Sequence, residues 1–170
     1  MPRPIRLYVR VVDAVNRVVG RLVMYMIFVM MGVLLLSSTS RTFFGVSYIW
    51  IVEMSQFLLA AYYLLGGAYS MQLDTHVRMD LLYSRWSPRR RAFTDSFTAF
   101  FLIFYLVFLL LGGISSTDYA ITYDQRNYSS WAPPLAPIKI IMTIGIALML
   151  LQAIAVFFKD LARARGETLA

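Results

Sequence analysis

Four long stretches of the chain carry no charged residue, and they predict its architecture. They are residues 22–40, 54–73, 96–117 and 140–158, with 19, 20, 22 and 19 residues in turn. At a rise of about 1.5 Å per residue, a helix over each stretch is roughly 30 Å long, which matches the hydrocarbon core of a bilayer. The pattern therefore predicts an all-α integral membrane protein. We place its four transmembrane spans at about residues 22–40, 50–73, 92–116 and 137–158, within one membrane domain over residues 1–170.

A different periodicity precedes the first span. Valines over residues 11–19 fall opposite a row of charged side chains that recur every three or four residues. This pattern predicts an amphipathic helix over residues 3–20, lying on the inner leaflet and able to continue into the first span. The alternative is a frayed tail whose charges only set the topology. The row consists of Arg3, Arg6, Arg10, Asp13, Arg17 and Arg21.

The basic residues predict the orientation in the membrane. The chain is 59% hydrophobic and only 15% charged, with a net charge of +7. Lysine and arginine number five before the first span, then one, five and two in the three connections, and three in the tail. Because these residues mark the cytoplasmic side, we expect both termini and the central connection to be cytoplasmic. Since the positive charge is explained by topology and by contact with anionic lipid, we do not expect nucleic acid to be a partner. The topology and lipid anchors of that connection are Arg78, Arg85, Arg89, Arg90 and Arg91.

Two spans carry a row of small and polar residues at spacings of three and four. Membrane helices lack a hydrophobic drive to associate, so such residues mark packing seams. The seams either hold the four helices together or dock a second membrane protein, and the spacing allows both. The candidate partner-interface residues are Glu53, Gln56, Ala60, Tyr63, Gly67 and Ser70 in the second span, with Asp95, Gly112 and Ser116 in the third.

Glu53 is the acidic residue best placed to have a role within a span. An ionisable group in the membrane is by default a candidate functional residue. An anchoring or interface role, with Arg41 as a partner near the same surface, competes with a role in proton coupling. Nearer the other side, Ser87 and Pro88 suit a helix start, and Arg91 and Asp95 lie four apart. The pairing of Arg91 with Asp95 either lowers the free-energy cost of placing Asp95 below the membrane interface, or is an exposed ion pair that contributes little to stability.

The connection before the fourth span is rich in aromatic residues and prolines. Its prolines end any helix before the fourth span begins near Pro137. Its aromatic side chains either anchor the chain at the headgroup level or dock a protein outside the membrane. The candidate docking residues are Tyr123, Tyr128 and Trp131.

Residues for catalysis are scarce. The chain has no cysteine and one histidine, His76, so a thiolate site or a bis-histidine haem cannot form within it. We find no glycine-rich phosphate loop and no nucleophile elbow. We therefore predict no catalytic, cofactor-binding or metal site, and a protein that is not an enzyme.

Several stretches together resemble the small permease subunit, DctQ-like, of tripartite ATP-independent periplasmic (TRAP) transporters. Trp50-x-x-Glu53 opens the second span, and "HVRMDLL" over residues 76–82 follows it. "SSWAPPLAPIKIIMTIGIALMLLQ" over residues 129–152 is similar to the fourth-span entry of that family. Val52 and Gln56 depart from it, because many members have a second carboxylate and an arginine there.

The resemblance implies a multi-pass subunit of a bacterial inner membrane and a transporter of three parts. A periplasmic substrate-binding protein captures an organic anion, and a large membrane permease subunit moves it with sodium. The small subunit pairs with the large one, braces it and helps dock the binding protein. The alternatives are an autonomous small proton-coupled exporter that uses Glu53, and a membrane anchor that shares haem with a partner.

The predicted topology can be tested with reporter fusions. A phosphatase or fluorescent reporter inserted within residues 85–91 should report a cytoplasmic location, because the arginines there oppose translocation. The same reporters inserted near Tyr128 should report the opposite side. A periplasmic signal from residues 85–91 would overturn the topology.

Overall fold

The uncharged stretches form four helices, as the sequence predicts. The computed structural model describes residues 3–73 and 88–164, with side chains at residues 3–73 and 97–162. The four helices are α1 (Arg3–Phe44), α2 (Ile49–Gln72), α4 (Pro88–Thr122) and α5 (Ala136–Ala164). Each is long and apolar enough to cross a membrane. The start of α4 at Pro88 agrees with the predicted Ser-Pro start, and α5 begins one residue before Pro137.

The first helix is the longest of the described helices. It runs without a break from Arg3 to Phe44, so the predicted amphipathic helix over residues 3–20 continues into the first span, and its place on the inner leaflet stays a prediction. At about 1.5 Å per residue these 42 residues span about 63 Å, roughly twice the hydrocarbon thickness. Part of α1 must therefore lie outside the hydrocarbon or run obliquely to the membrane normal.

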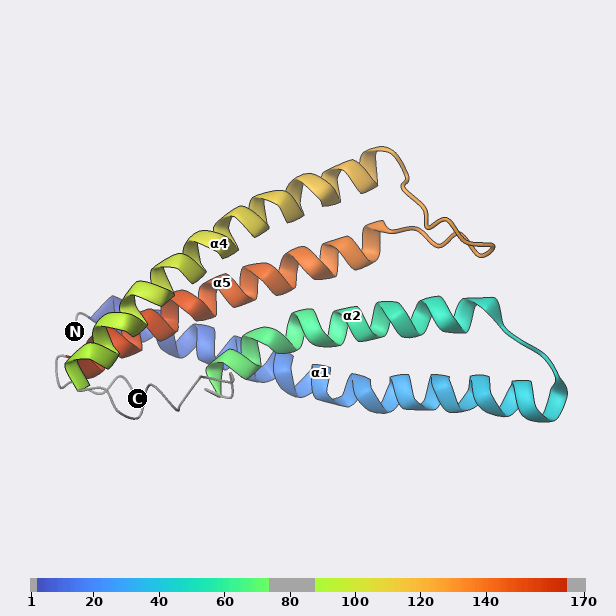
Figure 1. The fold of residues 1–170 in the computed structure, drawn as a ribbon, viewed down its shortest axis with the longest axis horizontal. Coiled ribbons are helices and arrows are strands. Elements are labelled where there is room, and N and C mark those ends of the chain that lie inside the picture. Colours follow the sequence, from blue (N-terminus) through green and yellow to red (C-terminus); the bar gives the residue numbers. More distant parts are fainter. Residues whose placement is uncertain (1–2, 74–87, 165–170) are drawn as a thin grey trace.

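Neighbouring helices pack in the spatial order α1, α2, α5, α4, and α1 also crosses α5. In Figure 1 the pair α4 and α5 diverges from the pair α1 and α2 toward the end that holds the two described connections. The start of α1, the end of α2, the start of α4 and the end of α5 meet at the opposite end. This placement agrees with a shared side for the two termini and the central connection, although it does not identify that side.

Glycines allow the closest helix approaches. A Cβ atom on Gly145 of α5 would lie 2.8 Å from the backbone oxygen of Leu64 in α2. A Cβ atom on Gly20 of α1 would collide with the side chain of Tyr69 in α2. Since lipid tails are as apolar as leucine, such close backbone contact replaces the hydrophobic drive of a soluble fold.

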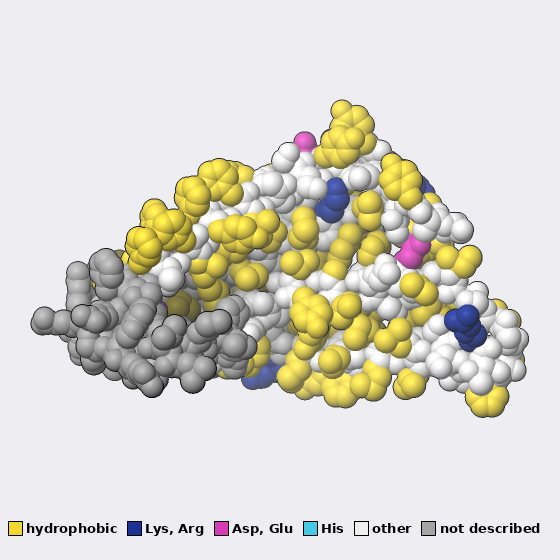
Figure 2. All heavy atoms as spheres, in the orientation of Figure 1, with side chains coloured by type: hydrophobic (Ala, Val, Ile, Leu, Met, Phe, Trp, Pro, Cys, Tyr) yellow, Lys and Arg dark blue, Asp and Glu magenta, His cyan; other side chains and the backbone are white. Residues whose placement is uncertain are grey.

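Few residues of the spans are enclosed by the protein. Only 11% to 28% of the residues in the most apolar window of each span are buried. The larger buried cluster joins Leu106 of α4 to Ile146 and Ala153 of α5. Figure 2 shows apolar side chains spread over the visible face of the described residues, with isolated charged groups among them. A surface of this kind needs lipid or another membrane protein around it.

The role of Gly145 can be tested by adding one methyl group. Gly145→Ala should destabilise the chain by about 1–3 kcal/mol, because the Leu64 backbone cannot move aside without separating α2 from α5. The matched control is Gly112→Ala, where a Cβ atom meets nothing within 4 Å. Thermal unfolding in detergent should show a lower midpoint for the Gly145 variant alone; equal midpoints would contradict the packing argument.

Candidate functional site

The predicted row on α2 divides into two rows in the structure. Glu53 is buried, and Ala60 and Gly67 are half-buried. A Cβ atom on Gly67 would lie 3.0 Å from the sulfur of Met149, so this row faces α5. Gln56 and Tyr63 are exposed and Ser70 is half-buried, and these three follow each other at intervals of seven residues. The seam thus packs within the chain along one row, and along the other it exposes Gln56 and Tyr63, which we call the open row.

Glu53 lies in a more enclosed place than its sequence position indicates. Only 7% of Glu53 is exposed, and its Oε2 atom has no hydrogen-bond partner. Arg41 is exposed and forms no ion pair with it, so the pairing expected between the two is not present. A buried carboxylate oxygen without a partner costs free energy unless another group donates to it.

The small residues of α4 also divide between inner and outer positions. Gly112 is exposed, and a Cβ atom there would meet nothing within 4 Å. The adjacent Gly113 instead faces α5, where a Cβ atom would lie 3.2 Å from Oγ1 of Thr143. Ser116 is half-buried, and its backbone oxygen accepts a hydrogen bond of 3.3 Å from Nζ of Lys139. The predicted pair of small residues therefore leaves Gly112 available to another chain.

A second set of polar contacts joins the end of α4 to the start of α5. Oγ1 atoms of Thr117 and Thr143 lie 2.9 Å apart, and Thr117 also donates to the backbone oxygen of Lys139 at 3.2 Å. Nζ of Lys139 donates to Oε1 of Gln125 at 2.7 Å. These bonds place the connection between α4 and α5 relative to both helices.

The connection between α4 and α5 has a defined backbone. The amide of Asn127 donates to the oxygen of Pro133 at 3.0 Å, and the amide of Leu135 donates to the oxygen of Gln125 at 2.9 Å. These bonds close a short hairpin-like loop. The three predicted docking residues, Tyr123, Tyr128 and Trp131, are all exposed on this connection.

Several predicted residues lie beyond the described structure. Arg78, Arg85 and His76 lie outside the described residues. Arg89, Arg90, Arg91 and Asp95 lie within α4, outside the part of that helix whose side chains are described. Their proposed anchoring and interface roles remain predictions.

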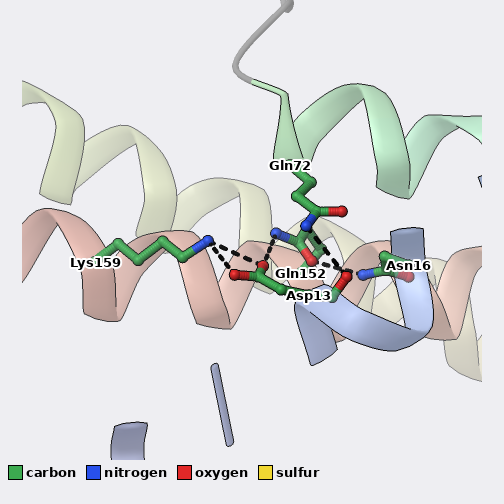
Figure 3. A network of polar contacts seen from close by, with 5 residues as sticks. All are labelled: Asp13, Asn16, Gln72, Gln152 and Lys159. Atoms are coloured by element: carbon green, nitrogen blue, oxygen red, sulfur yellow. Dashed lines mark hydrogen bonds and ion pairs between the residues drawn. The ribbon is translucent and has the colours of Figure 1, made fainter. Parts of the chain in front are cut away.

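The most connected polar site was not predicted from the sequence. It lies where α1 crosses α5 beside the end of α2, and Figure 3 shows its five residues. Nζ of Lys159 lies 2.6 Å and 2.9 Å from the two carboxylate oxygens of Asp13, and both side chains are about one-fifth exposed. Nε2 of Gln152 donates to the same carboxylate at 3.1 Å. We call this site the crossing cluster, formed by Asp13, Asn16, Gln72, Gln152 and Lys159.

Amide side chains extend the crossing cluster to all three helices. Nδ2 of Asn16 donates to Oε1 of Gln152 at 2.6 Å, and both residues are fully buried. Nε2 of Gln72 donates to the backbone oxygen of Asp13 at 3.1 Å. The side-chain amide oxygens, Oδ1 of Asn16 and Oε1 of Gln72, are buried and have no hydrogen-bond partner. The cluster therefore ties α1 to both α2 and α5, and two of its acceptors are left unused.

A sequence signal for this cluster exists but is weak. Asn16 follows Asp13 by three residues, and Gln152 interrupts the apolar stretch before Lys159. We expected Asp13 to belong to the basic row because its spacing fits. The residue lies at the edge of that row, where contact with Lys159 turns it inward. Helical periodicity cannot report a partner that is 146 residues away.

The described residues offer little for catalysis. No group of three or more histidine, cysteine or acidic side chains gathers among the described positions. The polar groups there join helices in pairs and small clusters, which is an arrangement for holding a membrane assembly together.

Comparison with protein families finds a match over most of the chain. The family model for tripartite ATP-independent periplasmic transporters, DctQ component, matches residues 30–163. This range covers most of the chain, and the first 29 residues lie before it. Neither the curated proteins nor the solved structures gave a match.

The crossing cluster can be measured with a double-mutant cycle on Asp13→Asn and Lys159→Met. We expect a coupling free energy of about 1–3 kcal/mol, because the pair is largely buried and shares Gln152. The matched control is the exposed pair of Asp124 and Arg126, with a distance of 3.0 Å, for which we expect less than about 1 kcal/mol. Equal couplings, measured by thermal unfolding in detergent, would contradict the assigned role.

Proposed function

The chain belongs to the DctQ component family of tripartite ATP-independent periplasmic transporters, and we propose that it braces the large permease subunit of such a transporter. The family is a family of transporter components and not of enzymes. Four long apolar helices agree with a multi-pass membrane protein. We place it in the inner membrane, with both termini cytoplasmic.

One structural observation carries the proposed pairing. The open row on α2 places Gln56 and Tyr63 at exposed positions, and α4 leaves Gly112 uncovered. Lipid tails cannot hydrogen-bond the amide of Gln56, and a glycine without contact gives no packing energy. Both features become favourable when another membrane helix packs there. We therefore assign the open row and Gly112 to the contact with the large subunit, together with Asp95 and Ser116.

Glu53 fits the same role. Its Oε2 atom is buried without a partner in the isolated chain. Because Glu53 lies on the row that packs within the chain, its carboxylate acts on the pairing through the position of α2 and not by direct contact with the large subunit. A glutamine in its place would keep the shape of the side chain but remove the charge.

The outer connection supports the proposed docking of a periplasmic substrate-binding protein. Tyrosine and tryptophan are enriched at protein interfaces, where they bury large areas at low entropy cost. The exposed Tyr123, Tyr128 and Trp131 lie on a loop whose backbone is held by hydrogen bonds. In this proposal the binding protein delivers an organic anion and the large subunit moves it together with sodium.

An autonomous proton-coupled exporter is the competing function, and Glu53 is the observation that favours it. A buried carboxylate can bind and release a proton during transport. Glu53→Gln then abolishes transport by the chain alone while complexes with other proteins are unaffected. In the proposed function, Glu53→Gln instead weakens the complex.

The proposed pairing can be tested by co-purification with the large permease subunit. Gly112→Leu should reduce the yield of complex about tenfold or more, because a few lost helix contacts amount to about 1.4 kcal/mol. The isolated variant should unfold at the same temperature as the wild type, since nothing lies within 4 Å of that position. The matched control is Leu36→Ala on the exposed face of α1.

Two outcomes would contradict this function. One is a complex that forms equally well with Gly112→Leu and with Leu36→Ala. The other is substrate transport by this chain reconstituted alone in vesicles.

A further inference from the structure

Five arginines on the first half of α1 have no counter-charge in the described structure. Arg3, Arg6, Arg10, Arg17 and Arg21 are all exposed. Within the residues the structure describes, none of them forms an ion pair. At about 100° per residue their positions fall within roughly 60° of one another around the helix. We call this surface the arginine row.

The crossing cluster removes the one acid from this row. Asp13 is the only acidic residue between Arg3 and Arg21. Its carboxylate faces Lys159 and Gln152 of α5, so it cannot neutralise the neighbouring arginines. The cluster therefore leaves five positive charges exposed along a length of about 27 Å, at about 1.5 Å per residue.

An exposed apolar strip runs beside the arginine row. Its members are between 44% and 66% exposed. The helix period of 3.6 residues separates the strip from the row by about 100°, and separates both from the buried face that includes Val12 and Asn16. The first half of α1 thus has three faces, an inward one, a basic one and an apolar one. The strip consists of Leu7, Val11, Val15, Val18 and Leu22.

We propose that the arginine row binds anionic phospholipid headgroups of the bilayer, with the apolar strip in contact with the acyl chains beneath them. Guanidinium groups pair with phosphate through two parallel hydrogen bonds, and a basic face beside an apolar face is the pattern of helices that lie in the membrane interface. The geometry supports this reading, because α1 is about twice as long as the hydrocarbon is thick and crosses α5 near Asn16.

The apolar strip distinguishes a bilayer from other acidic partners. Nucleic acid would contact the arginines but leave the strip exposed to water. An acidic protein surface would likewise leave the strip exposed to water, unless it also buried the five strip residues. A phospholipid bilayer provides phosphate and hydrocarbon next to each other, in the order that the two faces of α1 require.

The orientation depends on the inward position of Asp13. If Asp13 faced the row, it would cancel one charge near the middle of it. Lys159 holds the carboxylate at 2.6 Å and Tyr8 donates to the backbone oxygen of Leu151 at 3.0 Å, so two contacts set the rotation of this part of α1. The crossing cluster is thus the positioning element of the lipid-binding surface.

The proposal can be tested with the full chain in dodecyl maltoside, by titrating dioleoyl-phosphatidylglycerol or dioleoyl-phosphatidylcholine and counting bound lipids by native mass spectrometry. We expect preferential binding of the anionic lipid. The triple variant Arg6→Gln, Arg10→Gln, Arg17→Gln should bind it about a hundredfold more weakly, at about fivefold for each arginine. The matched control is Arg41→Gln, an exposed arginine at the other end of α1, which should leave binding unchanged.

The outcomes divide clearly. Equal binding of the two lipids by the wild type, or undiminished binding of the anionic lipid by the triple variant, would overturn the proposal. So would a triple variant that loses a co-purified protein while keeping its lipid. All variants should share the unfolding temperature of the wild type, since the substituted side chains are exposed and lack described partners.

A second measurement tests the orientation. The chain has no cysteine, so a single spin label can be attached at Val18→Cys on the strip or at Arg10→Cys on the row. In vesicles that contain phosphatidylglycerol, the label at position 18 should collide mainly with oxygen and the label at position 10 mainly with a water-soluble nickel complex. Equal exposure of both labels to nickel would place this part of α1 off the membrane.

Discussion

The ion pair between Asp13 and Lys159 sets where the first helix crosses the last, and much of the structure depends on that crossing. The two residues are 146 positions apart, and their helices also meet through Tyr8, through Asn16 and through a small apolar cluster. In lipid, where apolar side chains gain little by meeting each other, a largely buried ion pair with amide groups around it is a specific way to select one arrangement. Gln152 and Asn16 extend the pair, and Gln72 brings the end of α2 to the same point.

With that end of the molecule held together, the other end is open. The pairs α1–α2 and α4–α5 diverge toward the connections that join α1 to α2 and α4 to α5. Most residues of each span are not buried within the protein. This form suits a DctQ component, which belongs to a transporter of several parts. A closed bundle would satisfy its own helices and leave no polar row or uncovered glycine for a neighbour. The proposed contact with the large subunit uses these uncovered surfaces of α2 and α4.

The seams show how far residue patterns reach. The spacing of three and four on α2 predicted a single packing seam, whereas the structure divides its residues between two rows with different surroundings. Gly67 meets Met149 of α5, whereas Tyr63, four positions earlier, faces outward. The same holds on α4, where Gly113 makes the contact and Gly112 does not. A shift of one residue turns a side chain by about 100°, which is enough to move it from one neighbour to none.

The sequence by itself determined that the chain has four apolar segments long enough to cross a membrane, and it carried the resemblance that the family match confirms. These properties follow from composition and local periodicity, because the bilayer requires every span to be long, apolar and internally hydrogen-bonded. Only the tertiary structure decided that residues 3–44 form one helix crossing α5, that Asp13 turns inward, and that Glu53 is buried without Arg41 as its partner. Each of these depends on contacts between residues far apart in the chain. The residues adjacent in sequence do not identify the distant residues that a side chain contacts.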